Sequence, residues 1–288
     1  MTSTIEERRV PSAPSAVEVR SVRRRASQVR PAAILVAILV GGLACWELIS
    51  RLELIDPDFI SRPSAIAAAY PELAESARVR SALATTGKTM GMAFLYGTGI
   101  GLILGYLLGA SRLMRGAFFG PSLFLLSVPK SIFIPLFMVF FGINTTTAIY
   151  YGAFSSFIYV LVNVVGGFDL IESKHLLVAR AYAANPLHRI ADVILPASLP
   201  GVFTGVWYGL KGSLQGVLIF ELFVSVGGLG QIIRFYTNGL RVDMVFGLIL
   251  GISFVAILTG SAWSWVERRL SRWRPSDLGV VAQNNYVA

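Results

Sequence analysis

Residues Met244–Val266 read MVFGLILGISFVAILTGSAWSWV, a run without a charged side chain. A helix that crosses the hydrocarbon core of a bilayer needs about 20 such residues, because the core is about 30 Å thick. Over the whole chain of 288 residues, 55% are hydrophobic, 14% are charged and the mean hydropathy is +0.66. A soluble domain carries about 25% charged residues. The sequence therefore predicts an all-α integral membrane protein.

Five more apolar runs are long enough to span the bilayer. Six transmembrane helices are therefore expected, at Ala32–Ile49, Thr86–Ala110, Ala117–Phe141, Thr146–Phe168, Gly201–Val226 and Met244–Val266. The third run is interrupted by three prolines, which lack the N–H group that a helix interior uses: Pro121, Pro129 and Pro135. A further helical stretch near residues 64–77 is expected outside the membrane.

Lysine and arginine residues gather on one side of these spans. If the N-terminus is cytoplasmic, the cytoplasmic segments hold 16 of these residues and the outer segments hold seven. Because basic loops stay in the cytoplasm, both termini are expected there. The net charge of +9 comes largely from the chain ends, which favours anchoring at a lipid bilayer and not nucleic-acid binding. We divide the chain into a basic leader (1–30), a membrane domain (31–274) and a tail (275–288).

Small residues recur every four positions in two of the expected spans. The second span carries Gly97, Gly101, Gly105 and Gly109, and the fifth carries Gly201, Gly205, Gly209 and Ser213. Residues four apart share a helix face, and small side chains there let two helix backbones approach closely. The two stripes indicate either close packing within one chain or a dimer interface.

Two lysines lie about midway through expected spans, Lys130 in the third and Lys211 in the fifth. A lysine at the centre of a membrane helix costs about 2.5–3.5 kcal/mol on insertion scales, so it tends to face protein or a water-filled path. Gln215 is four residues after Lys211 and shares its face. We expect Lys130, Lys211 and Gln215, with Glu221 as a fourth candidate, to line a path that favours anions. The alternatives are an ion pair of either lysine with Glu221, or a lysine that extends toward the membrane surface.

The inner loop 169–200 carries the main functional signal. Residues 170–184 have a helix-forming composition, and Asn185-Pro186 ends that helix because the residue before a proline avoids the α region. A second short helix, 187–194, is expected to stop before Pro196. Two short helices on the inner face of a membrane would form a docking surface.

Two stretches of this loop, Val178–Asn185 (VARAYAAN) and Ile194–Gly201 (ILPASLPG), carry a resemblance. They are similar to the signature loop of binding-protein-dependent ABC importer permeases, and most similar to the sulfonate, taurine and nitrate branch. Supporting stretches are Val128–Ile143 (VPKSIFIPLFMVFFGI) and Phe220–Ile232 (FELFVSVGGLGQI). The resemblance implies a type I ABC importer permease fold.

The resemblance also implies that the loop is a coupling helix, seated in a separate ABC ATPase subunit. The residues that would make this contact are Leu177, Val178, Ala179, Arg180, Ala181, Tyr182, Ala183, Ala184, Asn185 and Pro186. Leu177 stands where the family usually has glutamate, and Ala183 where it has glycine. The other implied partners are a periplasmic or lipid-anchored substrate-binding protein and a second permease copy.

The expected function is that of a permease subunit in a bacterial inner membrane, importing a small solute by alternating access. The branch and the lysines together favour an anion such as a sulfonate, taurine, nitrate or an aromatic carboxylate. We expect no catalytic site, metal or cofactor on this chain, since histidine occurs only at His175 and His188 and cysteine only at Cys45. The alternatives are a self-sufficient secondary transporter or channel, which would be expected to show inverted repeats, and an intramembrane enzyme.

Overall fold

The structure is a computed structural model that describes residues 31–56, 58–171, 185, 188–224 and 227–270. The described residues are almost entirely helical and contain no strand, as the sequence predicts. In chain order the elements are α1 (Pro31–Arg51), α2 (Pro63–Glu75), α3 (Ala77–Ala110), α4 (Arg112–Ser127), η1 (Lys130–Phe133), α5 (Ile134–Phe141), α6 (Thr145–Asp169), η2 (Arg189–Ile194), α9 (Leu195–Val224), α10 (Gly228–Asn238) and α11 (Val242–Leu270).

Among the described residues, five helices are long and apolar enough to cross a membrane. They correspond to α1, α3, α6, α9 and α11. They correspond to five of the six expected spans. The third expected span is not one straight helix: Arg112–Ser127 and Lys130–Phe141 meet at an angle of 100°. Val128 is extended (φ −73°, ψ 134°) because Pro129 follows it, and the helix ends there. The expected interruption is therefore confirmed, and it is a sharp bend.

The fifth span begins earlier than expected. The short helix expected at 187–194 does not stop before Pro196; instead η2 continues directly into α9, which starts at Leu195. Helical residues run without a break from Arg189 into α9, so Pro196 interrupts the backbone hydrogen bonding without ending the helix. The fifth span therefore extends farther toward the inner loop than expected.

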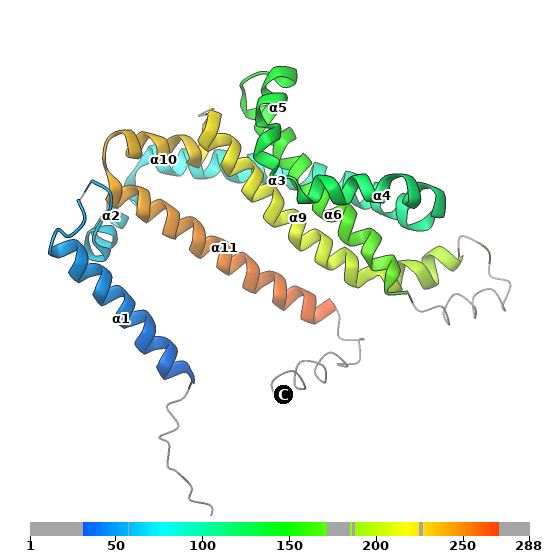
Figure 1. Ribbon diagram of the computed structural model, residues 1–288, viewed down its shortest axis with the longest axis horizontal. Coiled ribbons are helices and arrows are strands. Elements are labelled where there is room, and N and C mark those ends of the chain that lie inside the picture. Colours follow the sequence, from blue (N-terminus) through cyan, green and yellow to red (C-terminus); the bar gives the residue numbers. More distant parts are fainter. Residues whose placement is uncertain (1–30, 57, 172–184, 186–187, 225–226, 271–288) are drawn as a thin grey trace, which may run out of the picture.

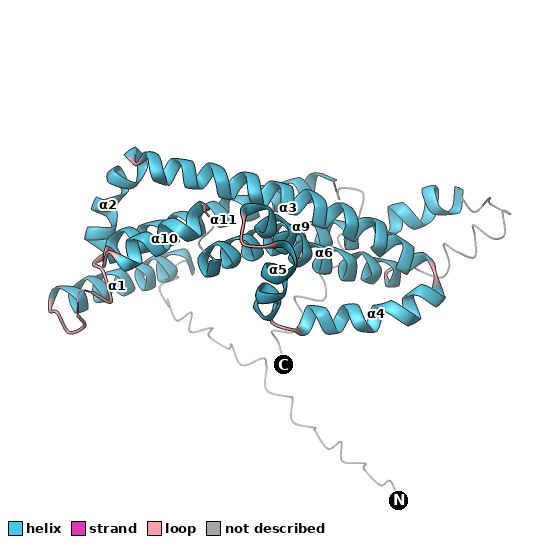
Figure 2. Ribbon diagram, turned by 90° about the horizontal axis from the view of Figure 1, so that it is seen from above, coloured by secondary structure: helices cyan, strands magenta, loops and turns pink. Residues whose placement is uncertain are grey.

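Helix α6 forms the centre of the molecule and packs between α3 and α9 (Figures 1 and 2). Both small-residue stripes face it. A Cβ atom on Gly101 would lie 2.6 Å from the Cβ of Val160, and one on Gly201 would lie 2.7 Å from the carbonyl oxygen of Asn163. Both stripes therefore serve packing within one chain, which is the first of the two readings of the sequence.

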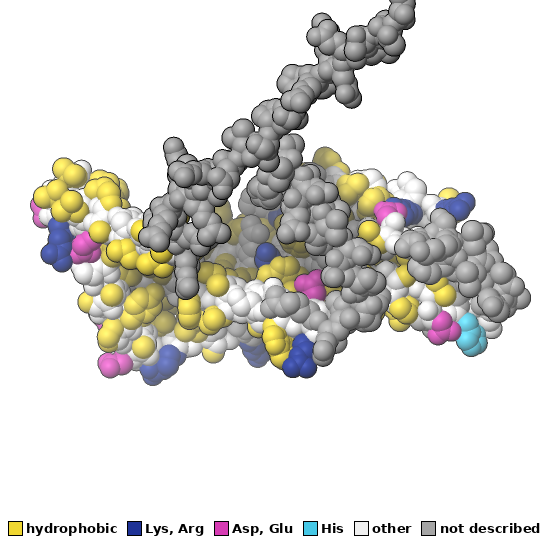
Figure 3. Space-filling model, turned by 90° about the horizontal axis from the view of Figure 1, so that it is seen from below, with side chains coloured by type: hydrophobic (Ala, Val, Ile, Leu, Met, Phe, Trp, Pro, Cys, Tyr) yellow, Lys and Arg dark blue, Asp and Glu magenta, His cyan; other side chains and the backbone are white. Residues whose placement is uncertain are grey.

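The outer helices are much less buried than this centre. Only 6% of the apolar window of α1 and 17% of that of α11 are buried inside the chain, against 67% for α6. Large apolar side chains lie on the surface with few charged ones between them (Figure 3). Such a surface is suited to lipid or to a partner chain and not to water.

The molecule has two distinct ends (Figure 2). Helices α2 and α10 and the starts of α3 and α11 lie at one end, which we call the α2–α10 end. The start of α4, the end of α6 and η2 lie at the other, which we call the loop end because α6 and η2 flank the inner loop in the sequence.

Candidate functional site

The structure brings the two intramembrane lysines onto one pair of tyrosines. The Nζ atom of Lys130 lies 4.4 Å from the centre of the Tyr159 ring, and that of Lys211 lies 5.4 Å from the Tyr208 ring. The two rings stack on each other with centres 6.1 Å apart and planes at 24°. We call these four residues the lysine–tyrosine face. Lys211 also lies over Trp207, with Nζ 4.8 Å from the ring centroid.

Each of these side chains is positioned by a simple local feature. Lys130 opens η1, just after the bend at Pro129, and so leaves the line of α4. Aromatic contacts hold η1 against α6, since Phe133 meets Phe154 edge to face at 5.4 Å. Tyr208 and Lys211 are three residues apart on α9 and therefore share one face of that helix.

The lysine–tyrosine face is open on this chain. Tyr208, Lys211 and Gln215 are exposed, and Lys130 and Tyr159 are half-buried. A cation over an aromatic ring gains about 0.5–2 kcal/mol, which does not offset the cost of placing lysine in lipid. The exposed cations therefore require water or protein opposite them. In the part of the chain that the structure describes, the expected alternative of an ion pair with Glu221 is not found.

Glu221 lies elsewhere and has a different set of partners. Its side chain is 1% exposed, and it accepts a hydrogen bond of 2.8 Å from the Thr86 hydroxyl group on α3. It accepts another of 3.2 Å from the backbone N–H of Gly230, while the N–H of Leu229 donates to Thr86 at 2.8 Å. Glu221 and Thr86 thus cap the first turn of α10, whose N–H groups have no partner inside the helix. The structure does not place Glu221 with the two lysines.

The sequence contains one signal for this cap, in the run Gly227-Gly228-Leu229-Gly230. Gly228 has φ +69°, and a Cβ atom there would collide with the carboxyl group of Glu221. Glycine is needed because it has no Cβ and adopts this backbone conformation freely. Thr86 could not be found in this way, since it lies 135 positions from Glu221.

The coupling residues predicted from the loop lie largely outside the described residues: this applies to Leu177, Val178, Ala179, Arg180, Ala181, Tyr182, Ala183, Ala184 and Pro186. Asn185 is described and exposed. The loop starts from a fixed point, because Arg115 of α4 donates a hydrogen bond of 2.6 Å to Asp169, the last residue of α6. This ion pair joins α4 to the helix from which the loop leaves.

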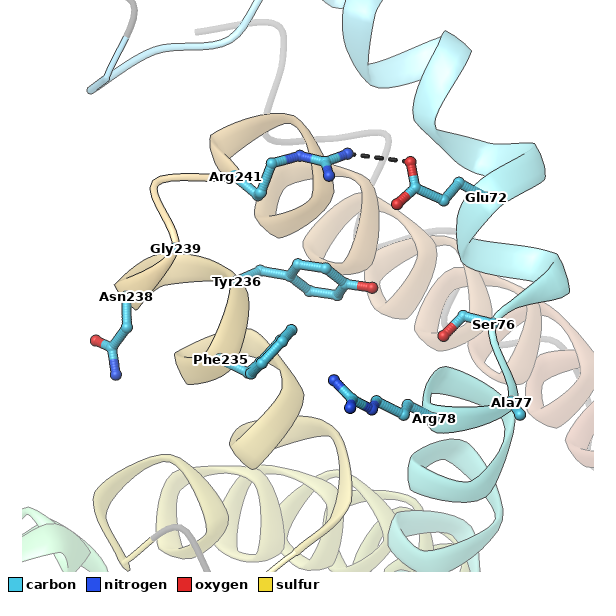
Figure 4. Close-up of a pocket in the computed structure, with 9 residues that line it drawn as sticks. All are labelled: Glu72, Ser76, Ala77, Arg78, Phe235, Tyr236, Asn238, Gly239 and Arg241. Carbon is cyan, nitrogen blue, oxygen red and sulfur yellow. Dashed lines mark hydrogen bonds and ion pairs between the residues drawn. The ribbon is translucent and has the colours of Figure 1, made fainter.

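A groove of about 730 Å³ opens at the α2–α10 end (Figure 4). Arg78 extends from α3 over the Phe235 ring of α10, with its guanidinium carbon 5.1 Å from the ring centre. Across the groove, Arg241 pairs with Glu72 at 3.1 Å and with Asp243 at 3.2 Å. The hydrogen bonds that Arg241 donates to Asp243 and Glu72 raise its pKa above the ordinary value for arginine. Two carboxylates thus balance the charge of Arg241 at this end of the molecule.

Cations within the spans of a helical multi-pass membrane protein favour a role in transport. The family model described as binding-protein-dependent transport system inner membrane component matches residues 97–272. The chain belongs to this family, and it is a permease component of an ABC importer, a non-catalytic membrane subunit.

The names of similar proteins agree with membership of this family. The chain is 30% identical to SsuC of Bacillus subtilis, a protein named for aliphatic sulfonates transport, over 82% of this chain and 86% of the relative. It is 26% identical to the taurine transport system permease protein TauC of Escherichia coli, over 83% of this chain and 90% of the relative. It is 25% identical to the riboflavin transport system permease protein RibX of Chloroflexus aurantiacus, over 52% of this chain and 56% of the relative.

Proposed function

We propose that this chain forms half of the translocation path of an ATP-driven importer for small anions, and that the lysine–tyrosine face lines that path. The observation that carries the proposal is the convergence of Lys130 and Lys211 on stacked Tyr159 and Tyr208. The two cations come from elements far apart in the chain, and both lie on a face that the chain leaves open. A second permease copy, identical or homologous, would complete the path opposite this face.

An anion is the solute that this face suits best. The lysine ammonium groups supply positive charge in a region of low dielectric, where it acts strongly on a passing anion. Tyrosine rings hold the ammonium groups without neutralising them, as a carboxylate would. The names of two relatives, which specify aliphatic sulfonates and taurine, support a small organic anion, and nitrate or an aromatic carboxylate would have the same charge.

The energy for transport would come from an ABC ATPase on a separate chain, so that this chain itself binds no nucleotide or other cofactor. Residues 177–186 would dock in that ATPase, at the loop end. Because η2 continues into α9, a movement of the docked loop would act directly on the helix that carries Tyr208 and Lys211. This direct connection supports transport by alternating access.

The two ends of the molecule would then face opposite compartments. We propose that the loop end and both chain termini are cytoplasmic and that the α2–α10 end faces outward, in agreement with the excess of basic residues in the inner segments. A substrate-binding protein would deliver the solute at the α2–α10 end, where the groove between Arg78 and Arg241 lies.

Uptake by the reconstituted importer, with its ATPase and binding protein, tests the path. Lys211→Met and Lys130→Met should each lower the rate of anion uptake about tenfold or more, because the anion loses a cation worth more than about 1.4 kcal/mol. Lys88→Met is the matched control: Lys88 is an exposed lysine on α3, outside the lysine–tyrosine face, and its removal should leave uptake unchanged. Normal uptake by a well-folded Lys211→Met variant would refute the proposal that the lysine–tyrosine face lines the path. Uptake without any ATPase would favour a secondary transporter over an ABC importer.

A further inference from the structure

A second space adjoins Lys211. It is a cavity of about 460 Å³ between α3, α9 and α11, and we call it the α9–α11 cavity. Helices α2 and α10 contribute to its wall near the α2–α10 end. The volume lies in the range of about 300–1,000 Å³ that small-molecule sites occupy.

The wall of this cavity is largely apolar and carries one charged side chain among the described residues. Lys211 is the single charged residue among the described residues that line it, and most of the others are leucine, isoleucine, valine, alanine or glycine. The polar side chains nearby already have partners: Tyr70 donates to the carbonyl oxygen of Gly247 at 3.2 Å, and Thr86 bonds Glu221. Thr259 likewise donates to the carbonyl oxygen of Val255 at 2.8 Å. Lys211 is therefore the charged group that the described wall of the cavity offers to a ligand.

Aromatic and polar contacts between helices keep the space open. Trp207 of α9 stacks on Trp263 of α11 with ring centres 6.0 Å apart and planes at 13°. The hydrogen bond from Tyr70 joins α2 to α11 farther along the same helix. Between these contacts, Gly87 and Gly251 line the cavity, and a Cβ atom on either would meet nothing within 4 Å.

We propose that the α9–α11 cavity binds the apolar body of an amphiphilic organic anion whose acidic group pairs with Lys211. The proposal rests on the proposed function and adds a chemical class of ligand to it. Lys211 belongs both to the cavity wall and to the lysine–tyrosine face, so the anionic group would sit at the path while the apolar part lies beside it. Such a site distinguishes between anions that differ in their apolar part. A lysine on the path alone does not distinguish between them.

Two other occupants fit these observations less well. An inorganic anion would pair with Lys211 but would leave the apolar wall without contacts. A membrane lipid could fill the apolar space with an acyl chain. However, Lys211 lies near the middle of Leu195–Val224, and lipid headgroups lie at the membrane surfaces, about 15 Å away. An anionic headgroup would therefore not reach this lysine.

Equilibrium binding to the intact importer in nanodiscs tests the proposal, with 1-octanesulfonate as the probe and ethanesulfonate and 1-octanol as comparisons. The sulfonate with the longer chain should bind about tenfold tighter or better than ethanesulfonate, because its methylene groups leave water. Gly251→Phe should fill the cavity and abolish this preference while leaving ethanesulfonate binding unchanged. Gly99→Phe is the control, since Gly99 also has open space at its Cα but lies outside the cavity.

Each result has a defined meaning. If Lys211→Met weakens 1-octanesulfonate but not 1-octanol, the pairing is supported. The cavity site is overturned if Gly251→Phe leaves the chain-length preference intact. It is also overturned if octanol competes as well as octanesulfonate, as expected for a lipid-filled space, or if neither binds, as expected for a space filled by a second copy. One combination of results would keep the proposed function and reject the cavity site. In it, Lys211→Met abolishes uptake, whereas Gly251→Phe keeps the preference for 1-octanesulfonate over ethanesulfonate.

Discussion

Helix α9 has two sides that differ in their packing. One side lies against α6 without space for an added carbon: a Cβ atom on Gly212 would lie 3.0 Å from the carbonyl oxygen of Ser155. The other side faces α11 across a cavity of about 460 Å³ and carries Trp207 and Lys211. The first side is made of small residues and the second of large aromatic and charged ones.

This difference indicates which parts can move. Van der Waals contact between closely approaching backbones holds α3, α6 and α9 together, since lipid provides no hydrophobic drive for helix association. Helix α11 is joined to α9 mainly through side chains at a few points, such as the Trp207–Trp263 stack. We infer that α3, α6 and α9 move as one unit and that solute-dependent changes occur between this unit and α11.

The largest expected effect comes from breaking the tight side. Gly201→Ala would place a Cβ atom 2.7 Å from the carbonyl oxygen of Asn163 and against the backbone of Gly167, neither of which can turn away. The cost should be about 3 kcal/mol, the upper part of the range for overpacking. A thermal unfolding measurement on the purified chain should show a clear loss of stability.

Gly99→Ala provides the reference for this variant. It lies on α3 with nothing within 4 Å of the added atom, and alanine favours the helix by about 1 kcal/mol. Its stability should be unchanged or raised. Equal behaviour of the two variants would mean that α6 and α9 are not in close contact.

A smaller loss of stability is expected at the cap of α10. Through this cap, Thr86 of α3 and Glu221 of α9 hold the start of α10. Thr86→Val keeps the side-chain shape but removes the hydroxyl group that bridges Glu221 and Leu229. The loss should be about 1–1.5 kcal/mol, since hydrogen bonds inside membrane proteins are individually modest. Hydrogen exchange at the amides of Leu229 and Gly230 should become faster.

The neighbouring residue supplies the control for the cap. Thr85 bonds only the carbonyl oxygen of Ser81 in its own helix, so Thr85→Val should leave the exchange of α10 unchanged. If Thr86→Val also leaves it unchanged, Glu221 alone holds the helix, and the bridge has no role.

Much of the fold follows from the sequence, and the reasons are local. Uninterrupted apolar runs predict the spans, and the three prolines of the third run predict that it is interrupted, because each feature acts on its own helix. Of the three, only Pro129 lies at the bend, since Pro121 lies inside α4 and Pro135 in the first turn of α5. The stripes of glycine predict close packing but do not name the partner helix, so only the structure shows that both face α6.

The candidate site was less predictable, because it depends on contacts between distant positions. The sequence singles out Lys130, Lys211 and Gln215 by their polarity, and their role in a path stays a prediction. Tyr159 and Tyr208 are ordinary membrane residues until the fold stacks them. Glu221 was grouped with the lysines by charge alone, whereas its partner Thr86 is an uncharged residue on another helix. The roles of residues 177–186 remain a prediction from the resemblance.

The central claim, that the lysine–tyrosine face borders a water-filled path, is tested most directly by thiol accessibility. In a Cys45→Ser background, which removes the one native cysteine, Gln215→Cys would be treated with a charged, membrane-impermeant thiol reagent in the assembled importer. Ile103→Cys serves as the reference, because Ile103 is 64% exposed on α3 and apolar, as expected for a side chain in lipid. We predict that the cysteine at position 215 reacts, at a rate that changes on adding ATP, and that the one at position 103 does not. A cysteine at position 215 as unreactive as the one at position 103, with and without ATP, would contradict the account.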